Sequence, residues 1–322
     1  MSTAPSRAKI WLALWAVYLL WGSTYLAIRV AVHPSHGHGL PPLMIAGARF
    51  TLAGGLMLVC TWHRPAPDGK PDPLGARQWY AAAIIGLALA FGGNGLVSIA
   101  EKRIPSGTAA VILATIPILV ALIAAALGRE RLGATHLVGL VLGFAGVAAL
   151  VVGTGSGRIS VAGTLIVVLA ALSWASGSVY STTAPTVRRP LVATGMQMLC
   201  GGIGCFIGAA ASGEFAGLHS DEFTLHALLA FTFLVVAGSL VAYTAYVWLL
   251  RNAELSLVTT YAFVNPVVAV ILGATILSEP FTIRSVIATV AVVIAVIVIL
   301  RRKPAMTAPD EAIVPAPDEV AV

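Results

Sequence analysis

The chain has 322 residues, of which 58% are hydrophobic and only 10% are charged. With a mean hydropathy of +0.94, this composition excludes a water-soluble globular protein of that length. The net charge of +6 is spread along the chain instead of gathered on one polar segment, so nucleic-acid binding is not expected. We expect an integral membrane protein that contacts the lipid bilayer.

Ten apolar segments follow one another, and each crosses or nearly crosses a hydrocarbon core of about 30 Å. Their unbroken apolar character predicts helices, because the strands of a membrane barrel alternate polar and apolar residues. In chain order the predicted transmembrane helices are residues 10–28, 41–62, 78–100, 104–128, 132–157, 159–187, 190–213, 223–250, 255–278 and 285–300. The predicted fold is therefore an all-α integral membrane protein with ten transmembrane helices.

The basic residues predict the orientation of these helices. With a cytoplasmic N-terminus, thirteen of the 19 Lys and Arg residues fall on the cytoplasmic side and four outside, while Arg29 and Arg49 lie within predicted helices. This distribution follows the positive-inside rule. Residues 1–9 are then a cytoplasmic N-terminus, and residues 301–322, rich in Pro, Ala and acidic residues, are predicted to be a disordered cytoplasmic tail.

The two halves of the chain repeat each other. Five predicted helices lie on each side of residue 157, and this odd number forces the halves into opposite membrane orientations. Polar or helix-breaking positions recur at offsets of 148 to 153 residues, in the pairs Trp21 and Trp174, Arg49 and Gln197, Asn94 and Tyr243, and Pro117 and Pro266. The sequence predicts two inverted five-helix repeats, residues 10–153 and residues 160–300.

Charged residues near the helices raise two alternatives. Arg49 is costly inside a membrane, and its side chain either reaches the outer interface or a helix-end carbonyl, or serves as a fixed cation for a substrate carboxylate or phosphate. Arg29 is expected to reach the outer interface. Glu101, with Lys102 and Arg103, is expected to form an interfacial charge cluster or a gate partner for Arg49.

Other polar groups suggest a binding site at the middle of the membrane. Pro117 and Pro266 break helices at matching positions, which is typical of a transporter site. Glu279 is expected to cap a helix end or anchor a loop. The predicted substrate-binding residues are Trp21, Thr24, Tyr25, Arg49, Asn94, Trp174, Tyr180, Gln197, Tyr243 and Asn265, although packing between helices explains each of them equally well.

The predicted helices lack acidic residues near their middles, which limits the kind of solute and of proton coupling that we expect. No Asp or Glu lies near the middle of a predicted helix, so we expect a neutral, zwitterionic or partly anionic solute, and no proton relay through a carboxylate. No nucleophile–base pair or metal-binding set accompanies them, so neither an enzyme, a metal nor a cofactor is expected.

Several stretches resemble the drug/metabolite transporter superfamily with two EamA-type domains and, within it, bacterial inner-membrane exporters of the YedA type. The matching stretches are Trp21-Gly22-Ser23-Thr24-Tyr25, Gly93-Asn94-Gly95, Pro105-Ser106-Gly107, Ser173-Trp174-Ala175 and residues 261–268. The resemblance implies a ten-helix inverted-repeat carrier of the inner membrane, with both termini cytoplasmic and a central cavity reached by alternating access, but it does not imply a substrate. The predicted function is export of amino acids or related small solutes, and the resemblance ranks export above import. A multidrug exporter of lipophilic compounds, or a channel or sensor, is the alternative. A monomer is expected, with a homodimer as the alternative.

Overall fold

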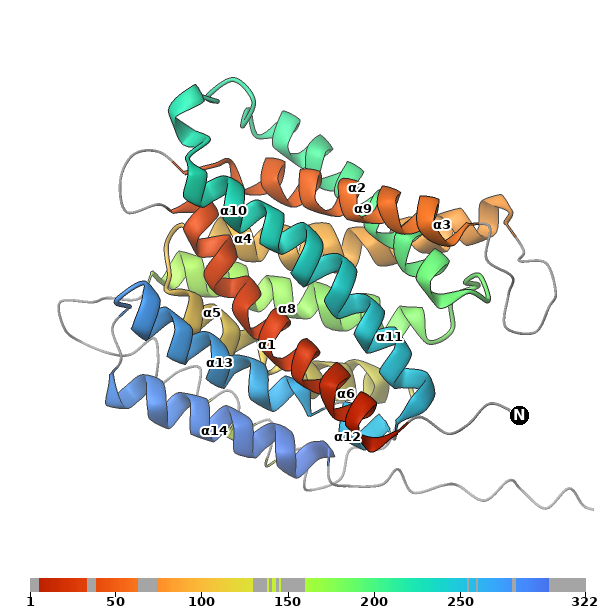
Figure 1. The fold of residues 1–322 in the computed structure, drawn as a ribbon. Helices are drawn as coiled ribbons and strands as arrows, with labels where there is room; N and C mark the ends of the chain where they lie inside the picture. Colours follow the sequence, from red (N-terminus) through yellow and green to blue (C-terminus); the bar gives the residue numbers. More distant parts are fainter. Residues whose placement is uncertain are drawn as a thin grey trace, which may run out of the picture.

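A computed structural model describes residues 6–33, 39–62, 74–129, 160–253, 255–258, 260–279 and 282–300, with isolated positions between 138 and 145. Over these residues the chain is mainly helical and forms no strand (Figure 1). Seven helical spans among them are long and apolar enough to cross a membrane. The all-α class is confirmed. Most of the predicted helix 132–157 and the tail 301–322 lie outside the described residues, so the total of ten helices stays a prediction.

Capping residues and prolines mark where several helices begin. The Ser6 hydroxyl accepts a hydrogen bond from the backbone N–H of Lys9 at the start of the first helix, so this helix begins within the predicted N-terminal segment. Pro42 occupies the first turn of the second helix, where its missing N–H costs nothing. The first half contains α1 (Arg7–Val32), α2 (Pro42–Thr61), α3 (Ala76–Gly86), the π-helical segment η1 (Leu87–Gly95), α4 (Leu96–Ala100), α5 (Ser106–Leu113) and α6 (Ile116–Ala126).

Helices of the second half also begin at capping residues. The side chains of Ser160 and Thr224 each accept a hydrogen bond from a backbone N–H in the first turn of the helix that follows. The second half contains α8 (Val161–Ser181), α9 (Pro190–Ala211), the short 3-10 helix η2 (Ser220–Glu222), α10 (Leu225–Phe233), the π-helical segment η3 (Leu234–Val241), α11 (Ala242–Asn252), α12 (Leu255–Val258), α13 (Tyr261–Ile276) and α14 (Ile283–Leu300).

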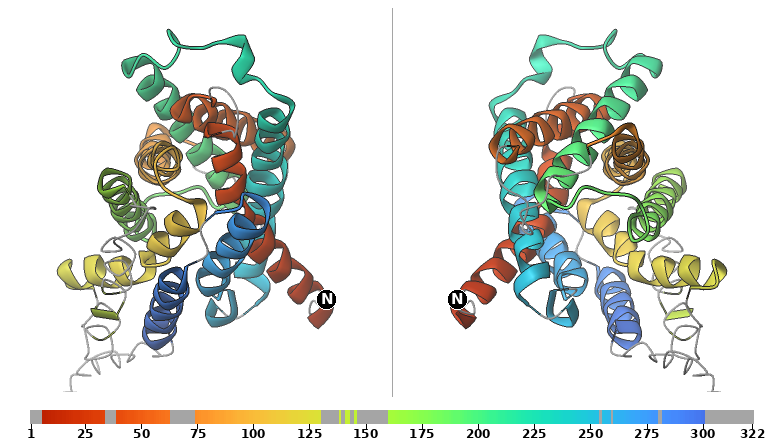
Figure 2. Two further views of the ribbon diagram at one scale, coloured as in Figure 1. Left: turned by 90° about the vertical axis from the view of Figure 1, so that its left-hand side faces the viewer. Right: turned by 90° about the vertical axis from the view of Figure 1, so that its right-hand side faces the viewer.

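Helix α1 joins the two halves of the bundle. It packs against α5 from its own half and against α10, α11 and α13 from the other (Figure 1). Helices α2 and α9 form a second contact between the halves, in which a Cβ at Gly54 would stand 2.6 Å from the backbone nitrogen of Leu199. Figure 2 shows the same helices nearly end-on, with α14 on the outside of the bundle next to α13. The two halves are thus interleaved.

Four spans depart from regular α-helix in their middles. Segments η1 and η3 are π-helical, and single turns of this kind are frequent at functional sites. The helix that starts at Ser106 is interrupted between Leu113 and Ile116, and Pro266 lies inside α13. These irregular stretches place backbone and side-chain polar groups in the interior of the bundle, where the cavity described next is found.

Candidate functional site

A central cavity lies between the two halves. Its volume is about 130 Å³, and its lining combines apolar and aromatic side chains with a few polar groups, as small-molecule sites do. Helices α1, α2, α5, α6, α8, α11 and α13 contribute to its lining, together with η1 and α4. Ten predicted residues line it: Trp21, Thr24, Tyr25, Arg49, Asn94, Pro117, Trp174, Tyr243, Asn265 and Pro266.

The Arg49 side chain is buried and held in place at the cavity. Its exposed fraction is 4%, its Nε donates a hydrogen bond of 2.9 Å to the Ser239 hydroxyl, and its guanidinium carbon lies 4.7 Å from the centre of the Phe50 ring. The Arg49 side chain therefore points into the protein, and its service as a fixed cation for a substrate stays a prediction. Among the described lining residues, Arg49 alone carries a charge.

Gly238 of η3 lies in close contact with α1 and α2 next to Arg49. The Trp21 indole N–H donates to the Gly238 carbonyl at 3.1 Å. A Cβ at Gly238 would stand 2.8 Å from the Thr24 methyl carbon and 3.3 Å from Arg49 Nη2. Segment η3 can therefore approach α1 and α2 only because this residue has no side chain.

Aromatic rings form one wall of the cavity. The Trp21 ring centre lies 5.1 Å from the ring centres of Tyr243, Tyr246 and Tyr261. Such packing fixes large apolar surfaces with little conformational freedom. Tyr261 lines the cavity but is missing from the predicted set, although it opens one of the stretches that carry the family resemblance.

Both proline breaks face the cavity. Proline lacks an N–H, so the carbonyls four residues earlier, at Leu113 and Ala262, lose their usual helical partner, and both of these residues line the cavity. Next to Pro266, the amide nitrogen of Asn265 can donate to the backbone carbonyls of Tyr18 at 3.2 Å and Tyr261 at 3.3 Å. The Asn265 oxygen is then the acceptor that this side chain can offer.

Two predicted site residues, Tyr180 and Gln197, lie outside the lining of this cavity. Tyr180 is near the end of α8, and its carbonyl accepts hydrogen bonds from Thr183 and Ala184. It stands six residues beyond Trp174, about 9 Å along the helix axis. The backbone of Gln197 packs against α3, where a Cβ at Gly86 would stand 2.1 Å from its carbonyl oxygen. Neither residue belongs to the cavity lining.

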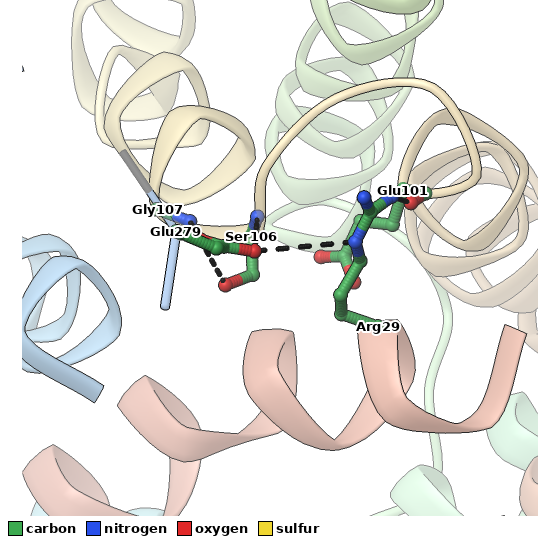
Figure 3. Close-up of polar contacts among 5 residues, drawn as sticks. All are labelled: Arg29, Glu101, Ser106, Gly107 and Glu279. Carbon is green, nitrogen blue, oxygen red and sulfur yellow. Dashed lines mark hydrogen bonds and ion pairs between the residues drawn. The ribbon is translucent and has the colours of Figure 1, made fainter. Parts of the chain in front are cut away.

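Three charged residues and two of their hydrogen-bond partners lie beyond one end of the cavity. We call them the end cluster: Arg29, Glu101, Ser106, Gly107 and Glu279 (Figure 3). Arg29 donates to the Glu101 backbone carbonyl and lies 4.0 Å from a Glu279 carboxylate oxygen, so it points into the protein and not to the interface as expected. Glu101 is fully buried, which corrects its expected interfacial position. Glu279 anchors the start of α5, as expected of a loop anchor.

Comparisons with known proteins agree with this architecture. The model of the EamA-like transporter family matches residues 8–152 and 161–301. The chain is 37% identical over 291 residues to the uncharacterized inner membrane transporter YedA of Escherichia coli strain K12, covering 89% of each chain. It is 27% identical over 293 residues to the WAT1-related protein At3g02690, chloroplastic, of Arabidopsis thaliana, covering 89% of this chain and 68% of that one.

A solved crystal structure of a protein that is 21% identical superposes with a TM-score of 0.58, covering 91% of this chain and 97% of the other, which shows a shared fold. With seven apolar helices of membrane-crossing length and a relative from the inner membrane, the chain is a multi-pass membrane protein. The names of the family and the relatives indicate a transporter and not an enzyme. The chain belongs to the EamA-like transporter family of the drug/metabolite transporter superfamily.

Proposed function

We propose that this protein is a secondary transporter that exports small solutes bearing a carboxylate, such as amino acids or related metabolites, by alternating access. The observation that carries the proposal is the position of Arg49. It is a buried cation in a cavity whose other described lining residues are apolar, aromatic or neutral polar. A carboxylate can accept two parallel hydrogen bonds from a guanidinium, which gives both affinity and orientation.

The rest of the lining fits an amphipathic solute. The wall of Trp21, Tyr243 and Tyr261 offers an apolar surface, while Thr24 and Asn94 offer neutral hydrogen-bonding groups. Lipophilic cations would also stack on these rings, which is the observation that favours the alternative of a multidrug exporter. Arg49 would repel such cations, so the carboxylated solute is the better match.

The alternating-access mechanism rests on the relation between the two halves. Three of the four recurring position pairs contribute both members to the cavity: Trp21 and Trp174, Asn94 and Tyr243, and Pro117 and Pro266. Together with the double family match, this supports the proposal of two inverted repeats, residues 10–153 and 160–300, with ten helices in all. One repeat can then close one side of the cavity as the other opens.

The proposed setting is the bacterial inner membrane, with both termini in the cytoplasm. It is supported by the name of the YedA relative and by the distribution of basic residues in the sequence. A monomer suffices for transport in this proposal, because the cavity is built from a single chain.

A thermal-shift screen of the purified protein in detergent tests the function. A ligand that binds the folded state raises the apparent melting temperature. Against a panel of amino acids, organic acids, nucleosides and lipophilic cations, the proposal expects stabilisation by one carboxylated class. Stabilisation by lipophilic cations alone would contradict it and favour the multidrug exporter.

A further inference from the structure

The end cluster lies next to one end of the cavity. Arg29 follows the cavity-lining residue Ile28 in α1, and Glu101 comes four residues after the lining residue Val97. In α5, Ser106 comes four residues before the lining residue Ala110. Four residues are about one helical turn, roughly 6 Å along the axis, so the cluster lies one turn beyond the cavity.

Within the cluster, Glu279 is surrounded by donors. Its carboxylate accepts hydrogen bonds from the Ser106 backbone N–H at 2.8 Å, the Ser106 hydroxyl at 2.9 Å and the Gly107 N–H at 3.3 Å. The positive end of the α5 dipole and Arg29, at 4.0 Å, favour a negative charge here as well. Glu279 therefore holds the end of α13 to the start of α5 through these contacts.

Glu101 lies in the opposite environment. Its side chain is fully buried, and neither carboxylate oxygen has a hydrogen-bond partner in the described part of the chain. Arg29 donates to its backbone carbonyl, while the Arg29 Nε faces Glu279 (Figure 3). Burial above all, and the nearby Glu279 charge, raise the pKa of the Glu101 carboxyl well above its usual range, although Arg29 acts in the opposite direction.

The other groups around Glu101 do not replace the missing partner. Tyr25 of α1 lies near enough to interact with it, and Lys102 and Arg103 of its own loop are exposed to solvent. Helix α8, which packs against α4, contains no charged residue, and the one charged residue of α2, Arg49, bonds to Ser239. One arginine thus faces two carboxyl groups, and one negative charge balances it.

From this arrangement we propose that Glu101 is a proton-binding site that is occupied while the end cluster is closed and emptied when the cluster opens. Opening admits water, which solvates the carboxylate and removes the cost of its charge. Closure at this end is then linked to the uptake of one proton. This proposal rests on the alternating access proposed above. The centres of the predicted helices contain no acidic residue, but Glu101 lies beyond the cavity at a helix end, so a proton can still bind a carboxyl there.

A pair of cysteines can report the closed state directly. A Cβ built at Gly107 stands 3.6 Å from the Cβ of Val270 on α13, within the range of about 3.5–4.5 Å that a disulfide requires. It also stands 3.1 Å from the Val270 Cα, so the helices must shift slightly to admit it, equally in every protein compared. We would introduce Gly107→Cys and Val270→Cys into a chain in which Cys60, Cys200 and Cys205 are replaced by Ala. Copper-phenanthroline oxidation of the purified full-length protein at a series of pH values then measures how often the end is closed.

The comparison of interest is the same cysteine pair with and without Glu101→Gln, because the pH dependence of thiol chemistry is common to both. Gln is neutral like the protonated carboxyl, so the variant should stay closed. The cross-linking rate of the Glu101 protein should fall relative to the variant by up to about tenfold per pH unit above the ordinary Glu pKa. Lys102→Gln, which removes an exposed neighbouring charge, should leave this ratio unchanged.

A ratio that does not vary with pH would overturn the proposal, as would slower cross-linking in a folded Glu101→Gln variant at every pH. If Glu101→Gln does not yield folded protein, Glu101→Met removes the same titration and gives the same comparison. The proton is the only ligand in this experiment. A negative cross-linking result would therefore not contradict the proposed carboxylated solute. A negative ligand screen would likewise not contradict the proton site.

Discussion

The replacement of Arg49 by Gln tests the proposed role of the cavity most sharply. The guanidinium is 4% exposed, and in the described residues only its Nε is engaged in a hydrogen bond, to Ser239. Its remaining N–H groups can serve a ligand. A hydrogen bond to a charged group contributes about 1.5–3 kcal/mol. Arg49→Gln should therefore weaken the binding of a carboxylated ligand about tenfold to about a hundredfold.

The assay compares the best carboxylated ligand from the screen with its primary amide, which is neutral at the same position. Binding constants come from melting temperatures measured over a range of ligand concentrations. The amide should bind about equally to the parent and to Arg49→Gln. Ser239→Ala is the matched control, because it keeps the charge and removes one neutral partner, for an expected loss of about 0.5–1.5 kcal/mol. An equal loss for carboxylate and amide, with an unchanged melting temperature of the free protein, would refute the reasoning.

Three further predictions concern the contacts around the site. Gly238→Ala places a methyl group 2.8 Å from the Thr24 methyl carbon and should cost about 1–3 kcal/mol of stability as well as ligand affinity, measured by thermal unfolding with and without ligand; an unchanged melting temperature would show that the contact can relax. Glu279→Gln weakens the bonds to Ser106 at the start of α5 and should lower stability by about 1.5–3 kcal/mol, measured in the same way. An unchanged melting temperature would show that these bonds do not hold α5 in place. Because the pKa of Glu101 is raised, its contribution to stability is complete below the ordinary Glu pKa and is lost as pH rises. The melting temperature should therefore fall less steeply with pH in Glu101→Gln than in the parent. Parallel curves of melting temperature against pH would contradict this.

The sequence predicted much of the fold and of the site for one physical reason. Polar and helix-breaking residues are expensive inside a membrane, so each of them stands out against apolar helices. Arg49, Asn94 and the two prolines were found in this way, and the structure places all four at one cavity. The pairing of positions in the two halves added Trp21 and Trp174, which also line it.

The remaining differences depend on the rotation and register of helices, which sequence does not fix. Gln197 was predicted as the counterpart of Arg49, but the close contact of Gly86 with its carbonyl orients α9 toward α3 at this position. Ser239 carries no sequence signal, because a lone serine in an apolar helix usually bonds within its own helix. Glu101 looks like an ordinary helix-end residue in the sequence, and only the tertiary structure shows that it is buried.

Alternating access would let the cavity exchange solute between the two sides of the membrane. The most direct measurement is counterflow in proteoliposomes that contain a high internal concentration of the carboxylated compound that stabilises the protein best, with a trace of labelled compound outside. A carrier should accumulate label transiently above its equilibrium level, and Arg49→Gln should abolish this accumulation. Uptake that rises only to equilibrium and does not saturate would contradict the account and would indicate a channel.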